Sequence, residues 1–197
     1  MKQEDIISYF DAHAPTWDNK MICSERIVNT ILSCALLTEH PSVLDVACGT
    51  GILFPFYLKH GVASVTAIDI SGAMVDIARS KAVGPSVEVI CGDAQVYPYS
   101  KKYDAIMIYN AFPHFTEPGK LLRYLIGYLL PGGTITVAHG MSRNSIATHH
   151  AGSAAQVSIE LPSTQQIVDW LEPYCTVTTV IDTDEMYQLT AIYNGLH

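Results

Sequence analysis

Apolar runs alternate with amphipathic segments along this chain. Nearly continuous apolar runs predict strands at residues 42–47, 64–70, 86–91, 103–109 and 134–139, and two more near 175–182 and 186–193. Apolar residues at helical spacing predict helices at residues 3–13, 22–38, 50–60, 72–82, 117–130 and 164–173. Strands that are apolar throughout and are separated by helices are typical of an α/β fold whose parallel sheet is covered on both faces.

The last two predicted strands are joined differently from the others. Only a few residues, around Asp184 and Glu185, separate them, and this is too short for the crossover that parallel neighbours need. We therefore expect a C-terminal antiparallel hairpin at the end of a mostly parallel sheet.

The first predicted strand runs into a glycine-rich turn, SVLDVACGTG over residues 42–51. Ligands of open parallel sheets bind beyond the carboxyl ends of the strands, and Gly49 and Gly51 would let the main chain approach such a ligand closely. Asp69 ends the second strand, eighteen positions after Gly51, where a carboxylate suits the two hydroxyls of a ribose. The glycines alone would also fit an ordinary tight turn, but together with Asp69 they predict a nucleoside site.

The class of nucleoside follows from two neighbouring residues. The dinucleotide fingerprint has a third glycine, and Phe54 stands at that position here. A carboxylate at Asp45, close to the turn, would repel a pyrophosphate and attract a cation. S-adenosylmethionine meets both conditions, because it carries a sulfonium and an ammonium group and no phosphate.

Segments in this order resemble the motifs of the class I S-adenosylmethionine-dependent methyltransferases. They are VLDVACGTG (43–51), AIDIS (67–71), CGDA (91–94), YDAIMIYNAFPHF (103–115) and LLPGGTITV (129–137). The resemblance implies a seven-stranded Rossmann-like sheet and a reaction whose product is S-adenosylhomocysteine. It also implies that Asp93 contacts the adenine amino group and that Ala94 contacts the neighbouring ring nitrogen. The cofactor-binding residues that these motifs imply are Asp45, Ala47, Cys48, Gly49, Gly51, Asp69, Ile70, Met74, Gly92, Asp93, Ala94 and Asn110.

The N-terminal segment YFDAHAPTWD (9–18) resembles that of small-molecule methyltransferases of the ubiquinone- and menaquinone-biosynthesis type. This resemblance implies that the segment folds over the cofactor and that Tyr9 and Trp17 help to close the site. The alternative is an amphipathic cap that touches no ligand. We expect one domain over residues 1–197, divided into a helical cap (1–40), a cofactor-binding core (41–139), a substrate loop (140–162) and a C-terminal helix with the hairpin (163–197).

Histidines are frequent where the acceptor should lie. His114 follows the fourth strand, His139 ends the fifth, His149 and His150 follow in the loop, and His13 lies in the cap. Three interpretations stay open: polar lining of the cleft, a general base at His114 or His139, and a metal site built from His139, His149 or His150. The chain has no His-x-x-x-His helix pair that would favour a metal, so the metal requirement is undecided.

Charge and composition narrow the partners. The formal net charge is -8 and the longest basic run is Lys101-Lys102, which disfavours nucleic acid and anionic membrane surfaces. We expect no signal peptide and no membrane insertion, since no apolar stretch approaches the roughly 18 residues that a span needs. The five cysteines form no CxxC pair, which is typical of reduced thiols in a cytoplasmic protein.

Methyl transfer from S-adenosylmethionine to a small-molecule acceptor is therefore the predicted function. Two alternatives stay open: an NAD(P)-dependent oxidoreductase, which would share the glycines and Asp69, and a non-catalytic module that binds S-adenosylmethionine. The sequence does not reveal the acceptor, the methylated atom or the oligomeric state.

Overall fold

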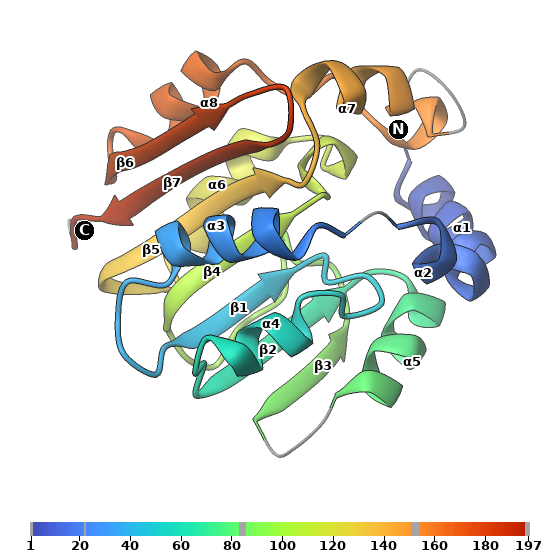
Figure 1. The fold of residues 1–197 in the computed structure, drawn as a ribbon, viewed down its shortest axis with the longest axis horizontal. Coiled ribbons are helices and arrows are strands. Elements are labelled where there is room, and N and C mark those ends of the chain that lie inside the picture. Colours follow the sequence, from blue (N-terminus) through green and yellow to red (C-terminus); the bar gives the residue numbers. More distant parts are fainter. Residues whose placement is uncertain (1, 22, 83–85, 151–153, 196–197) are drawn as a thin grey trace.

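One seven-stranded sheet forms the centre of the protein, in the order β3-β2-β1-β4-β5-β7-β6 (Figure 1). The strands are β1 (Ser42–Val46), β2 (Ser64–Asp69), β3 (Val87–Cys91), β4 (Tyr103–Tyr109), β5 (Leu129–His139), β6 (Cys175–Asp182) and β7 (Tyr187–Tyr193). β1 to β5 run parallel, whereas β7 runs antiparallel to both β5 and β6. The predicted fold class and the C-terminal antiparallel hairpin are thus confirmed.

The computed structural model describes residues 2–21, 23–82, 86–150 and 154–195, without the side chains of Lys20, His149 and His150. Its helices are α1 (Gln3–His13), α2 (Trp17–Lys20), α3 (Glu25–Ala35), α4 (Phe54–Lys59), α5 (Gly72–Lys81), α6 (Pro118–Ile126), α7 (Arg143–His150) and α8 (Thr164–Leu171). Three short 3₁₀ helices are η1 (Ala14–Thr16), η2 (Phe112–His114) and η3 (Ala155–Val157). Over the described residues, no helix combines the length and apolar character that crossing a membrane requires.

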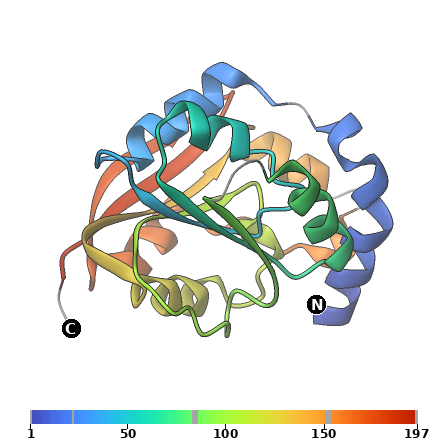
Figure 2. The same cartoon turned by 90° about the horizontal axis from the view of Figure 1, so that it is seen from below.

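Helices cover both faces of the sheet. α3, α4 and α5 lie on one face, and α6 and α8 lie on the other (Figures 1 and 2). β1 shows how one strand serves both faces: Leu44 and Val46 pack into the core under α6 and α8, while Val43 packs under α3 and α4. Burial on both sides explains why these strands are apolar throughout.

Four parts of the chain differ from their predicted extents. α4 begins at Phe54 rather than near residue 50, because Gly51 has a φ of +78° and interrupts helical geometry. α6 ends at Ile126, and β5 already begins at Leu129, opposite Tyr103, with an irregularity in register between Tyr103 and Ala105. The expected substrate loop at 140–162 contains α7 and η3; buried Ile146 packs α7 onto the core.

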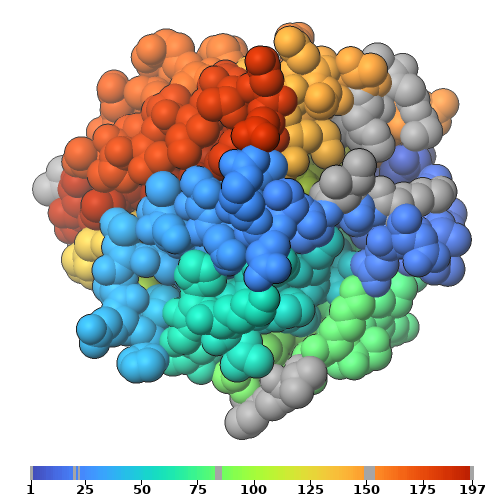
Figure 3. All heavy atoms as spheres, viewed as in Figure 1, coloured from blue at the N-terminus to red at the C-terminus, as the bar shows by residue number. Residues whose placement is uncertain are grey.

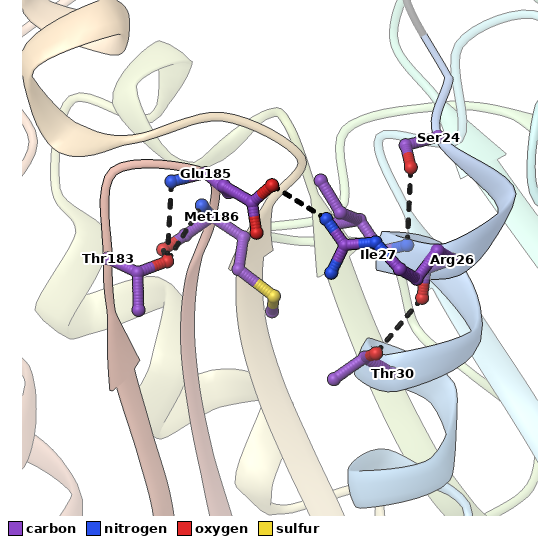
Figure 4. Close-up of polar contacts among 7 residues, drawn as sticks. All are labelled: Ser24, Arg26, Ile27, Thr30, Thr183, Glu185 and Met186. Carbon is purple, nitrogen blue, oxygen red and sulfur yellow. Dashed lines mark hydrogen bonds and ion pairs between the residues drawn. The ribbon is translucent and has the colours of Figure 1, made fainter.

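The start of α3 is fixed against the hairpin of β6 and β7 (Figure 4). The Ser24 hydroxyl caps α3 by accepting from the Ile27 N–H at 3.5 Å, and Arg26 forms an ion pair with Glu185 at 2.7 Å. Both charged side chains are largely exposed, so the pair contributes little by itself. α1 and η1, which come before α3 in the chain, pack against α5, on the side of the molecule away from β6 (Figure 3).

Candidate active site

The glycine turn follows β1 in an unusual backbone conformation. Ala47, Gly49 and Gly51 all have positive φ angles, of 54°, 55° and 78°. A Cβ on Gly49 would meet no heavy atom within 4 Å, so this part of the main chain faces open space. Cys48 also lines that space, and burial raises the pKa of its thiol well above the usual value, which keeps the thiol neutral. The turn therefore presents bare backbone to a cavity.

Asp69 joins this turn to the end of β2. One of its carboxylate oxygens accepts from the Gly49 N–H at 2.8 Å, and the other accepts from the Ser71 N–H at 2.9 Å. Burial raises the pKa of Asp69, while the hydrogen bonds from Ser71, Gly49 and Ile70 counteract that shift. Asp69 lines the cavity, so its carboxylate lies where a ribose diol could donate to its remaining lone pairs.

Asp45, which was predicted to bind the cofactor, does not line the cavity. It is 1% exposed and lies next to the Tyr57 hydroxyl. Burial, followed by repulsion from Asp69, raises the pKa of Asp45 to about 8, although the Tyr57 hydroxyl lowers it in part. The carboxyl group is therefore protonated at neutral pH. A role of Asp45 toward a cationic ligand stays a prediction, and the carboxylates that face the cavity are those of Asp69 and Asp93.

The end of β3 supplies a third side of the cavity. Gly92 donates its N–H to the Asp69 carbonyl at 2.9 Å, which fixes the CGDA segment beside β2. Asp93 accepts from the Gln3 side chain at 3.0 Å and from the Gln95 N–H at 2.9 Å. Gly92, Asp93 and Ala94 all line the cavity. The acidic groups available to a cationic ligand are thus Asp69 and Asp93.

Residues of α1 and α2 line one side of the cavity, and Figure 1 shows these two helices beside α5. Gln3, Ile6 and Phe10 lie three and four positions apart, so they share one face of α1, and all three line the cavity. Trp17 lines it too, with its ring edge-on to Phe10 at 5.5 Å. Tyr9 does not line it and instead stacks on His13 at 4.2 Å. Helical geometry thus gives Phe10, rather than Tyr9, to the cavity.

Two carboxylates connect the cap to the core. Asp11 accepts from the Ser71 hydroxyl at 2.5 Å and from the Ala73 N–H at 3.1 Å, at the N-terminus of α5. Asp18 accepts from the Thr50 hydroxyl at 2.5 Å and pairs with Lys81 at 2.5 Å. Both acids stand in the predicted N-terminal segment, but nothing in a linear sequence indicates their partners.

Removing the first connection should loosen the cap. We expect Asp11→Ala to raise hydrogen exchange across residues 3–13 about tenfold, because loss of a helix-capping carboxylate costs roughly 0.5–2 kcal/mol. Hydrogen–deuterium exchange with mass spectrometry measures this. Asp5→Ala is the matched control, since Asp5 is an exposed carboxylate on the same helix. Equal exchange in both variants would show that Asp11 does not hold the cap.

His114 and Asn110 line the cavity after β4. Asn110 has a φ of 55°, and its side-chain oxygen accepts from the Gly140 N–H at 2.9 Å, which joins the ends of β4 and β5. His114 lies in η2 with its ring edge-on to Phe10 at 4.9 Å. Burial raises the pKa of nearby Tyr109 to about 12, so this cavity-lining phenol stays protonated.

Among the predicted histidines whose side chains are described, His139 and His13 do not join His114 at the cavity. His139 is 2% exposed and lies against Tyr187, whose ring centre is 6.5 Å away, and His13 contacts the Tyr9 carbonyl. The side chains of His149 and His150 lie outside the described residues, so the metal prediction stays a prediction. Within the part of the chain whose side chains are described, no three His, Cys, Asp or Glu residues are grouped to hold a metal ion.

The cavity measures about 260 Å³. Predicted residues that line it are Trp17, Ala47, Cys48, Gly49, Asp69, Ile70, Met74, Gly92, Asp93, Ala94, Asn110 and His114. Predicted residues that do not are Tyr9, Asp45, Gly51 and His139. Lining residues that the sequence analysis missed include Gln3, Ile6, Phe10, Met21, Thr50, Tyr109 and Phe115. For the residues of α1, helical spacing was the signal that could have found them.

Comparison with known proteins gives two kinds of similarity. Residues 43–133 match the family described as a methyltransferase domain. The chain is 28% identical over 131 residues to malonyl-[acyl-carrier protein] O-methyltransferase of Priestia megaterium, covering 64% of this chain and 47% of the relative. It is 29% identical over 96 residues to ubiquinone biosynthesis O-methyltransferase of Coxiella burnetii, covering 47% and 41%. The chain thus spans less than half the length of these curated relatives.

The fold has close structural counterparts. N-methyltransferase NodS from Bradyrhizobium japonicum, solved in complex with S-adenosyl-l-homocysteine, superposes with a TM-score of 0.75. The two chains are 12% identical, and the superposition covers 95% of this chain and 98% of NodS. At this identity the likeness concerns the fold.

Proposed function

We propose that this chain is a class I S-adenosylmethionine-dependent methyltransferase, which transfers a methyl group from S-adenosylmethionine to a small-molecule acceptor; the match of residues 43–133 to a methyltransferase domain supports this. The observation that carries the proposal is the joining of the glycine turn to Asp69, at 2.8 Å from Gly49, inside the matched segment. S-adenosylmethionine would supply an electrophilic methyl group on a sulfonium that departs as neutral S-adenosylhomocysteine.

The lining of the cavity suits this compound. Gly49 offers backbone without a side chain, Asp69 offers a carboxylate for a ribose, and Asp93 offers another beside β3. Lysine and arginine are absent from the described residues that line the cavity, which favours a cationic nucleoside over one with phosphates. A Cβ on Gly51 would lie 2.5 Å from the Phe54 ring, so Phe54 fills the space next to the turn and leaves the dinucleotide fingerprint incomplete.

The residues of this chain would act by positioning and by excluding water. Methyl transfer needs an acceptor in line with the bond that breaks, so orientation supplies much of the rate. Phe10 and Trp17 give the cavity aromatic walls on the side of the cap, which would help to exclude water. His114 is the candidate general base, because it lines the cavity and imidazole is the side chain that most often serves as a general base.

The acceptor is proposed to be small. The cavity of about 260 Å³ is smaller than the roughly 300–1,000 Å³ that is usual for small-molecule sites, and it must also admit the cofactor, which leaves little room for a large acceptor. The formal net charge of -8 argues against a nucleic-acid substrate. A cytoplasmic setting belongs to the proposal and is supported by the five cysteines, which are all free.

Cofactor binding and transfer can be measured in one series. Titration calorimetry of the protein with S-adenosylmethionine and, separately, with NADH should give heat for the first compound and none for the second. Incubation with the tritiated methyl donor and candidate acceptors then detects transfer. Heat with NADH would support the oxidoreductase, and binding without transfer to any acceptor would support the non-catalytic module.

Asp69→Ala should weaken S-adenosylmethionine by about 1–3 kcal/mol, or roughly 5- to 150-fold in Kd, because hydrogen bonds to a charged group are lost. Titration calorimetry checks this. Asp76→Ala is the matched control, since Asp76 is an exposed carboxylate on α5 that lies outside the cavity lining. An unchanged Kd in Asp69→Ala would remove Asp69 from the binding site.

A further inference from the structure

The orientation of His114 is set by a segment far along the chain. Its Nδ1 lies 2.8 Å from the carbonyl oxygen of Val157 and 3.2 Å from the hydroxyl oxygen of Ser158. Val157 ends η3, and Ser158 follows it directly. His114 itself lines the cavity from η2. Val157 and Ser158, which are not among the lining residues, thus contact an imidazole that lines the cavity.

The Val157 contact determines which ring nitrogen carries the proton. A carbonyl oxygen accepts hydrogen bonds and never donates them, so Nδ1 must be the donor at 2.8 Å. A neutral imidazole has one N–H, and its other nitrogen is then a proton acceptor. His114 is therefore held as the Nδ1–H tautomer, and Nε2 is its basic nitrogen.

Two backbone hydrogen bonds fix the chain around this contact. The Ile159 N–H donates to the Pro113 carbonyl at 2.8 Å. Pro113 directly precedes His114, and Ile159 follows Val157 by two positions, so this bond joins the two segments that meet at the imidazole. Val157 is 2% exposed, and its own N–H donates to the Ala154 carbonyl at 3.0 Å. The position of the Val157 carbonyl is thus built into the packing of η3 against η2.

We propose that the Val157 carbonyl and the Ser158 hydroxyl are positioning groups, which hold His114 so that its Nε2 accepts a proton from a hydroxyl acceptor. The proposal rests on the proposed function, because it assigns a task to the same cavity. Phe10 packs edge-on against the ring at 4.9 Å and restricts its rotation from the side of the cap. Three groups from two segments therefore fix one side chain, as general-base catalysis requires.

The proposed step is an in-line displacement at the methyl carbon. A lone pair of the acceptor oxygen forms the new C–O bond, and the bonding pair of the broken C–S bond stays on sulfur, which becomes neutral. The O–H proton passes to Nε2 of His114, so the positive charge moves from the sulfonium to the imidazolium. Transfer of that proton to water restores the neutral ring. No oxidant or reductant is needed.

The surroundings of His114 favour an uncharged hydroxyl compound as the acceptor. Phe10, Trp17, Tyr109 and Phe115 supply aromatic walls. Among the described lining residues no cationic side chain is present to neutralise a carboxylate or phosphate acceptor. A carboxylate acceptor would also give His114 no proton to remove. A neutral phenol suits this site, because it needs no cationic partner and it carries an O–H proton that His114 could accept.

The tautomer can be observed directly and without an acceptor. Long-range ¹H–¹⁵N correlation spectra of histidine-labelled protein distinguish the two tautomers by the shifts of the ring nitrogens, and the signals lost in His114→Gln assign His114. We expect the Nδ1–H form at neutral pH. His60 is an internal reference for the opposite form, because its Nε2 lies 3.1 Å from the Asn29 side-chain oxygen. An Nε2–H tautomer at His114 would overturn the proposal.

The catalytic consequence is measured with substituted phenols and the matching benzoates as probes, using tritiated S-adenosylmethionine. We expect transfer to phenols, a loss of roughly 100-fold or more in His114→Gln, and a loss of about three- to tenfold in Ser158→Ala. The acidic limb of the rate against pH should disappear in His114→Gln, whereas a merely structural residue would lower the rate at every pH. Ser33→Ala, on the exposed side of α3, is the control that keeps full activity.

Two results would contradict the catalytic part: transfer to benzoates in preference to phenols, or a His114→Gln variant as active as the parent. Calorimetry separates this failure from failure of the proposed function. If S-adenosylmethionine binds the parent and His114→Gln equally, then only the assignment of the base is at stake. The tautomer measurement decides the positioning claim whether or not a phenol in the panel is methylated.

Discussion

Replacing Asp45 by asparagine is expected to stabilise the protein strongly at neutral pH and to flatten the pH dependence of its folding. Asp45 is buried in the folded chain, where burial and the nearby Asp69 raise its pKa from 3.8 to about 8. Between these values the folded state holds a proton that the unfolded state has released. The free energy of unfolding therefore falls as pH rises, by about 1.4 kcal/mol per pH unit from this one group.

The sign and the window of this effect follow from the two pKa values. Below about pH 4 both states are protonated and Asp45 carries no penalty, whereas above about pH 8 the penalty is complete. Asp45→Asn should remove it, so the gain should approach about 4 kcal/mol at pH 7. Urea unfolding from pH 4 to pH 8 measures the difference. Asp76→Asn, at an exposed site, should leave the slope unchanged, and an unaltered slope in Asp45→Asn would contradict the buried, protonated state.

The second large effect concerns the glycine turn. We expect Gly51→Ala to lower the free energy of unfolding by about 2–5 kcal/mol. Its φ of +78° costs an L-residue about 1–2 kcal/mol, and its Cβ would lie 2.5 Å from the Phe54 ring, an overlap that costs about 1–3 kcal/mol more. Phe54 is buried and begins α4, so the ring cannot move aside freely. Chemical denaturation measures the loss.

Gly49 provides the matched control for this steric argument. Its φ of +55° is also left-handed, but a Cβ there would meet nothing within 4 Å. Gly49→Ala should therefore cost only the backbone part, about 1–2 kcal/mol. A smaller residue opposite should relieve Gly51→Ala, so Phe54→Leu combined with it should be less destabilising than the sum of the two changes. Equal losses in Gly49→Ala and Gly51→Ala would show that Phe54 does not determine the effect.

The main features of the fold could be read from local patterns. Apolar runs correctly indicated every strand, and the short connection near Asp184 correctly indicated the antiparallel hairpin. The glycine turn and Asp69 were found together because both stand at strand ends, which meet at one edge of a parallel sheet. The ends of the elements followed less directly from the apolar pattern. The positive φ of Gly51, for example, makes α4 begin at Phe54, later in the chain than predicted.

Side-chain direction was the part of the site that the motifs could not supply. Asp45, Gly49 and Gly51 belong to one motif, yet of these three residues only Gly49 lines the cavity. Successive residues of a strand and turn point to different sides. On α1, Tyr9 lies outside the face that lines the cavity and stacks on His13 instead. His139 and His114 both follow strand ends, but His139 packs against the hairpin.

The sequence by itself determined the order and type of the elements, the nucleoside-binding turn and the carboxylate at residue 69, because these depend on neighbours within a few positions along the chain. Only the tertiary structure decided the protonation of Asp45, the fastening of the cap by Asp11 and Asp18, and the choice of His114. Each of these depends on groups that are distant in sequence and adjacent in space, so burial and partners arise only once the chain has folded.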